Sequence, residues 1–102
     1  MKTDELEKYK FPIGQFDSPA VITKEVLGRY ISDIEKLPEK LRNLVSNFSE
    51  QQLNTPYRPD GWTVKQVIHH IGDSHMNALI RFKLTLTEDL PTIKPYFEDK
   101  WA

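Results

Sequence analysis

The chain has 102 residues, of which 38% are hydrophobic and 28% charged, so it has enough apolar material for a globular domain and no apolar run long enough to cross a membrane. Its 14 basic and 15 acidic residues nearly balance, which excludes the broad positive field that attracts nucleic acid. Cysteine is absent, so disulfides and thiolate metal sites are excluded, and any metal must be held by nitrogen and oxygen atoms.

The N-terminal segment, residues 1–22, begins with a polar stretch and then carries Pro12, Gly14 and Pro19 among scattered aromatic residues. The polar stretch lacks the apolar core of a secretory signal, so the cytoplasm is the expected compartment. The prolines and the glycine favour an ordered arm without regular structure, which we expect to lie across the domain surface.

A first long helix is predicted over residues 23–48, with Thr23 as its N-cap. Apolar residues recur there at spacings of three and four, as on one helical face: Val26, Tyr30, Ile34, Leu37, Leu41, Leu44 and Phe48. Pro38 interrupts this face, because an interior proline removes a backbone hydrogen bond and clashes with the preceding turn. Since the apolar phase continues through Pro38, we expect either one kinked helix or two consecutive helices that share the face.

A second long helix is predicted over residues 63–89. Thr63 and Gln66 form a capping-box pattern at its start, which is the strongest helix start in the chain. An apolar stripe follows at helical spacing, and Leu90 before Pro91 ends it. The two long helices predict an all-α protein, and each has a flank that further helices of a bundle would cover.

Residues 90–102 form a predicted irregular tail that stops without a helix cap or a polar taper. We therefore expect residues 1–102 to be a single incomplete domain, the N-terminal part of a longer helical bundle.

All three histidines lie on the second predicted helix, within seven residues: His69, His70 and His75. At about 100° per residue, His75 points along the apolar stripe, as a core or interface histidine does, and His69 points well away from it. His70 lies on the flank of the stripe, where its imidazole could enter a bundle interior and keep one nitrogen toward a polar cavity. Zinc and nickel bind imidazole nitrogen, but a catalytic site generally takes three protein ligands, so one histidine is too few.

Two other residues are candidates for the neighbourhood of the metal or the substrate. Asp73, three residues after His70, could be a weak ligand or a hydrogen-bond partner there, although a solvated helix carboxylate is the ordinary interpretation. Arg81 is the second candidate, and its alternative role is to favour the helix dipole. No nucleophile triad, cofactor-binding motif or glycine-rich phosphate loop is present, so no catalytic residue is assigned.

A continuous series of distinctive sequence motifs surrounds the histidine pair in residues 55–77, and further motifs follow in residues 80–84 and 91–96. Together with residues 11–16, this series closely resembles the YfiT-type branch of the DinB-like metal-dependent hydrolases, over essentially the whole chain. The resemblance implies a four-helix bundle with up-down-down-up connectivity, of which this chain supplies the N-terminal arm and the first two long helices. It also implies a homodimer that holds nickel or zinc through three histidines, the first of which is His70.

The other two ligands implied by the resemblance form a His-x-x-x-His pair on the last long helix, and nothing in this sequence matches that pair. The implied activity is hydrolysis of a small-molecule substrate, or transfer of a low-molecular-weight thiol such as bacillithiol to an electrophile. Either reaction uses a metal to activate water or a thiol as the nucleophile. We expect the chain alone to be inactive.

Two alternatives stay open. The chain could be a catalytically inactive helical module that dimerises through its uncovered apolar faces. Two copies could instead exchange elements to complete a bundle, although they would supply only two ligands equivalent to His70.

Overall fold

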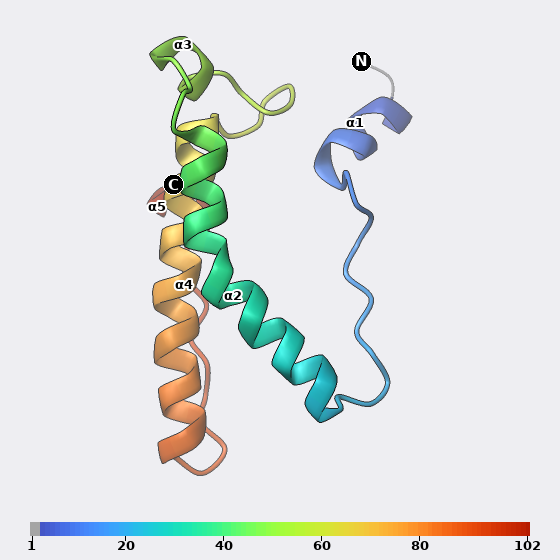
Figure 1. The fold of residues 1–102 in the computed structure, drawn as a ribbon, viewed down its shortest axis with the longest axis vertical. Helices are drawn as coiled ribbons and strands as arrows, with labels where there is room; N and C mark the ends of the chain where they lie inside the picture. Colours follow the sequence, from blue (N-terminus) through green and yellow to red (C-terminus); the bar gives the residue numbers. More distant parts are fainter. Residues whose placement is uncertain (1–2) are drawn as a thin grey trace. The chain divides into compact units, whose positions relative to one another are not determined.

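The computed structural model describes residues 3–102, which form helices and no strand, so the predicted all-α class is confirmed (Figure 1). The described elements are α1 (Thr3–Lys10), α2 (Lys24–Val45), α3 (Glu50–Leu53), α4 (Val64–Thr87) and α5 (Glu98–Trp101). The chain divides into two compact units, one that ends at Gln51 and one that begins at Gln52. The interpretation of the chain as one incomplete domain stays a prediction.

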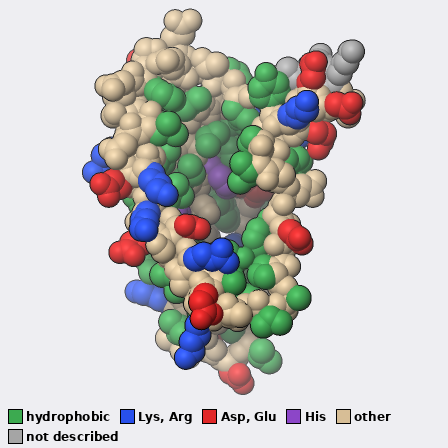
Figure 2. All heavy atoms as spheres, turned by 45° about the vertical axis from the view of Figure 1, so that its right-hand side comes forward, with side chains coloured by type: hydrophobic (Ala, Val, Ile, Leu, Met, Phe, Trp, Pro, Cys, Tyr) green, Lys and Arg blue, Asp and Glu red, His purple; other side chains and the backbone are tan. Residues whose placement is uncertain are grey.

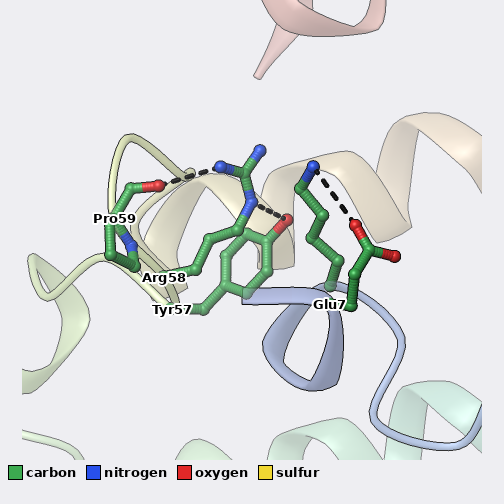
Figure 3. Close-up of polar contacts among 5 residues, drawn as sticks. Glu7, Tyr57, Arg58 and Pro59 are labelled. Atoms are coloured by element: carbon green, nitrogen blue, oxygen red, sulfur yellow. Dashed lines mark hydrogen bonds and ion pairs between the residues drawn. The ribbon is translucent and has the colours of Figure 1, made fainter. Parts of the chain in front are cut away.

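In the first unit, the prediction of an arm without regular structure is wrong for α1. Acidic residues in the first turn of α1 and lysines in its last turn complement the helix dipole. Lys10 Nζ also lies 3.9 Å from Glu7 Oε1, one turn earlier (Figure 3). The helix-breaking residues act only after α1, where Gly14 has a φ of +83°. The irregular part then contacts α2, because the rings of Phe16 and Tyr30 lie 6.5 Å apart.

Helix α2 begins where the sequence predicts, because the Thr23 side chain accepts a hydrogen bond of 3.2 Å from the Val26 N–H. Pro38 lies inside a single continuous helix, which selects the first of the two alternatives (Figure 1). Figure 1 shows the axis of α2 changing direction part-way along, as a proline causes. The helix ends at Val45, three residues earlier than predicted, and the Phe48 N–H donates to the Val45 carbonyl in the turn that follows.

The second unit begins with a tight loop that leads into α4. An isolated antiparallel bridge pairs Pro56 with Thr63 across this loop. Within the loop, Arg58 donates to the Tyr57 hydroxyl at 3.1 Å and to the Pro59 carbonyl at 2.8 Å (Figure 3). A Cβ at Gly61 would lie 2.5 Å from the Arg58 side chain and 3.1 Å from its carbonyl oxygen, so this close approach requires glycine.

The chain reverses after α4, where Leu90 has a φ of +45°, and the tail runs back along α4 (Figure 1). The prediction of an irregular tail is confirmed up to Phe97 and wrong for α5, which packs against α4. No side chain caps α5 at its N-terminus, so contacts outside this short helix hold it in place.

None of the described residues is fully buried. Large hydrophobic side chains therefore reach the surface, as the green atoms of Figure 2 show. Leu44 on α2 is 69% exposed and Leu86 on α4 is 82% exposed. No helix within residues 3–102 has the length and apolar character needed to span a membrane.

Candidate metal centre

The start of α4 is fixed by a reciprocal pair of hydrogen bonds, as the sequence predicts. The Gln66 N–H donates to Thr63 Oγ1 at 3.1 Å, and the Thr63 N–H donates to Gln66 Oε1 at 3.0 Å. This capping box satisfies two of the N–H groups that a helix start leaves without partners. The first turn therefore sets the direction in which each later side chain of α4 points.

The three histidines of α4 differ in exposure as predicted. His69 is exposed, whereas His70 and His75 are half-buried. Nδ1 of His70 is buried, and no hydrogen-bond partner for it is present among residues 3–102. Burying a polar atom without a hydrogen-bond partner costs about 1–3 kcal/mol of free energy, so a ligand that binds this nitrogen would remove that cost.

His70 lies in an open pocket of about 410 Å³, which we call the His70 pocket; its lining residues are Trp62, His70, Arg81, Pro95, Tyr96 and Glu98. Four of these six side chains are aromatic or charged, and a fifth is the imidazole itself. One wall of the pocket is formed by α4 and by Trp62, the residue before the helix cap. The other wall is formed by the tail. The imidazole thus faces a space that a small ligand could enter.

Trp62 holds the imidazole from one side. The centroids of the Trp62 and His70 rings lie 4.8 Å apart, with 52° between the ring planes. The Trp62 indole N–H donates a hydrogen bond of 3.1 Å to Asp99 Oδ1 on α5. This bond joins the tail to the start of α4 and fixes the ring that packs on His70.

Of the two other predicted residues, the structure brings only one into the pocket. Arg81 lines the His70 pocket, and Asp73 does not. Asp73 is half-buried, and its backbone carbonyl accepts a hydrogen bond of 2.9 Å from the Asn77 side chain. A role for the Asp73 carboxylate beside the imidazole stays a prediction.

Sequence reasoning missed the residues that the rest of the chain brings to His70. Trp62 had a usable signal, because it directly precedes the Thr63 cap, and a hydrophobic residue at that position often packs on the first turns of the helix. Tyr96 and Glu98 had none, since their place depends on the chain reversal after α4.

The part of the chain that the structure describes contains no group of three or more His, Asp or Glu side chains that could hold a metal ion. The orphaned imidazole nitrogen of His70 fits a single ligand of a metal site. The described residues therefore fit one ligand of such a site, and they do not form a complete site.

Comparison with known proteins places the chain in a family. The model of the DinB superfamily matches residues 33–102. A protein of Bacillus mycoides (strain KBAB4) named "putative metal-dependent hydrolase" is 52% identical over 97 residues, which cover 95% of this chain and 56% of that protein. A protein of the same name from Bacillus cereus (strain B4264) is 55% identical over 93 residues, covering 91% of this chain and 54% of its own length.

A solved structure is also similar. YfiT from Bacillus subtilis, described as "a probable metal-dependent hydrolase with an unusual four-helix bundle topology", matches with a TM-score of 0.85 and 48% identity over 92% of this chain and 54% of its own. The predicted fold class and the resemblance are thereby confirmed. The chain spans about half the length of the relatives it matches. By sequence and by structure, this chain belongs to the DinB superfamily.

Proposed function

We propose that this chain is part of a metal-dependent hydrolase in which His70 donates one imidazole nitrogen to a divalent metal ion. The observation that carries the proposal is the buried, unpartnered Nδ1 of a histidine that lines a ligand-sized pocket. Relatives more than 50% identical to the chain are named metal-dependent hydrolases with the qualifier "putative", which supports the same reaction class.

The donor chemistry favours nickel or zinc, because both bind imidazole nitrogen well. A site with three protein ligands would need at least one ligand from outside the described residues, since these hold no group of three. When bound, the metal would supply a Lewis acid that activates water for hydrolysis. Thiol transfer, a small-molecule substrate, a homodimer and a cytoplasmic location stay predictions.

The role of Trp62 in this proposal is to orient the imidazole. Its ring packs on His70 and is itself held by the hydrogen bond to Asp99. An imidazole that is restrained before a ligand binds loses less conformational freedom on binding. Trp62 is therefore a positioning residue.

A first experiment titrates Ni²⁺ into the chain and follows the ring signals of the three histidines by NMR. We expect the paramagnetic ion to broaden the signals of His70 and Trp62 first, because these rings lie together. The effect should disappear in His70→Ala and persist in the matched control His69→Ala, whose histidine is exposed. Equal broadening at His69, His70 and His75 would contradict the assignment.

The reaction class is tested in a protein that carries this chain at the full length of its relatives. Hydrolysis of a panel of small esters and amides should stop after chelation and return with Zn²⁺ or Ni²⁺. His70→Ala should lower kcat/KM by about 100-fold or more, because loss of a ligand exceeds the 10- to 100-fold cost of losing an outer partner. Full activity in the presence of the chelator would refute metal dependence.

A second candidate function is a helical association module without catalysis. The large hydrophobic side chains that remain exposed favour it. The two candidate functions differ in whether His70 binds a metal ion, since an association module without catalysis requires none. The Ni²⁺ titration therefore separates them.

A further inference from the structure

We propose that Arg81 forms an anion-binding site in the His70 pocket, and that this site takes the carboxylate of a small ligand with an apolar body. The inference rests on the proposed function only in naming that ligand a substrate. The binding site itself requires no metal.

Arg81 and His70 lie on the same face of α4. They are eleven residues apart in the sequence, which is three helical turns and about 20°, with a rise of about 16 Å. Helical side chains lean toward the N-terminus of their helix, so the Arg81 side chain leans toward His70. Both side chains line the His70 pocket, and a ligand bound to Arg81 can therefore extend toward the imidazole.

The Arg81 guanidinium is poorly satisfied within the described residues. Its hydrogen bond there runs from Nη2 to the Lys94 carbonyl at 3.4 Å, which is long for an N–H donor. No carboxylate among residues 3–102 forms an ion pair with it. A guanidinium has five N–H donors in a planar fork, and this fork matches the two oxygens of a carboxylate.

The charge of the pocket favours a single carboxylate. Glu98 lines the His70 pocket together with Arg81, and its side chain makes no ion pair with the guanidinium. The charges of Arg81 and Glu98 offset each other, so the pair gives little net attraction that would compensate a dianion for leaving water, which costs more for a dianion than for a monoanion. A carboxylate keeps the bidentate fit and carries the smaller desolvation cost.

The apolar body of the ligand has a place next to Arg81. An adjoining pocket of about 320 Å³, which we call the apolar pocket, shares Arg81, Pro95 and Tyr96 with the His70 pocket. Its remaining wall is mostly apolar and includes Ile80, Leu84, Ile93, Phe97 and Trp101. Arg81 therefore lies where a polar and an apolar space meet, and a carboxylate at the end of a short hydrocarbon chain matches both.

The test titrates hexanoate, hexyl phosphate and hexanol into the metal-free chain and follows the Arg81 Nε–H and Tyr96 ring signals by NMR. We expect hexanoate to bind at least tenfold more tightly than hexanol and more tightly than hexyl phosphate. Arg81→Gln should abolish the preference for hexanoate over hexanol. Arg81→Lys, which keeps the charge and loses the fork, should retain part of it.

The matched control is Arg58→Gln, because the Arg58 guanidinium is bound to Tyr57 and Pro59 and does not line either pocket. This variant should retain the full preference for hexanoate. Hexanoate binding no tighter than hexanol binding, or unchanged in Arg81→Gln, would overturn the anion site. Tighter binding of hexyl phosphate would overturn its assignment to carboxylates.

The His70→Ala variant separates this inference from the proposed function. It should lose the Ni²⁺ response and keep the preference for hexanoate over hexanol, since the anion is bound by Arg81. A metal response without an anion preference would refute only the present inference. An anion preference without a metal response at His70 would refute only the metal assignment.

Discussion

Thr63 determines where α4 begins, so its hydroxyl has an effect on stability that can be measured. Thr63→Ala removes the oxygen that accepts from the Gln66 N–H and should lower the free energy of unfolding by about 1 kcal/mol. Urea unfolding followed by circular dichroism measures this change. Thr85→Ala is the matched control, because the Thr85 hydroxyl bonds to a carbonyl within the helix and caps nothing. Equal stabilities of the two variants would contradict a role for the cap.

At the residue scale, the sequence predicted the position of His70 on α4 better than it predicted the residues that surround the imidazole. The angular position of His70 on α4 followed from the helical period and agrees with its half-buried side chain. Asp73 was a candidate because it is close in sequence, yet it lies outside the His70 pocket. Tyr96 and Glu98 reach the pocket through the reversal at Leu90, and no local pattern predicts a chain reversal of that geometry.

Pro38 should lower the stability of helix α2, and replacing it should restore that stability. Pro38→Ala restores a backbone N–H within a continuous helix and should stabilise α2 by up to about 3 kcal/mol. Amide hydrogen exchange in the turn before residue 38 should slow accordingly. Pro19→Ala, in the irregular segment before α2, should leave that exchange unchanged. Unchanged or faster exchange in Pro38→Ala would show that the bend itself stabilises the fold.

At the element scale, the two long helices could be predicted because their signals are local. Caps at Thr23 and Thr63 set the starts, and apolar periodicity gave the extents to within a few residues. The short helices α1 and α5 were missed for different reasons. The charge pattern of α1 was readable but was outweighed by the prolines and the glycine that follow it. Helix α5 lacks a cap, and its packing on α4 is a tertiary contact that the sequence does not display.

The exposure of large hydrophobic side chains should make the chain associate in solution. Sedimentation velocity should show species heavier than the monomer whose share grows with concentration, because none of the described residues is fully buried. Leu86→Glu places a charge at a side chain that is 82% exposed and should lower that share. Lys83→Glu, one turn earlier on α4, is the control for added negative charge. A concentration-independent monomer would contradict the expectation.

At the scale of the molecule, the all-α class could be derived from periodicity, but the four-helix bundle could not. Two amphipathic helices fit many helical folds, and only the distinctive motifs in residues 11–16, 55–77, 80–84 and 91–96 indicated one family. The same limit applies to the metal. One imidazole in a pocket is compatible with several metals, and the described residues hold no larger group of ligands that would distinguish them.

The two tryptophans of the chain occupy different pockets, and this separation has a practical consequence. Trp62 packs on His70, and Trp101 lines the apolar pocket with its ring 4.7 Å from that of Tyr96. Each indole is thus a built-in fluorophore for one of the two spaces. Single-tryptophan variants, Trp101→Phe and Trp62→Phe, would report quenching from the imidazole side and from the hydrocarbon side as separate optical channels, without any attached label.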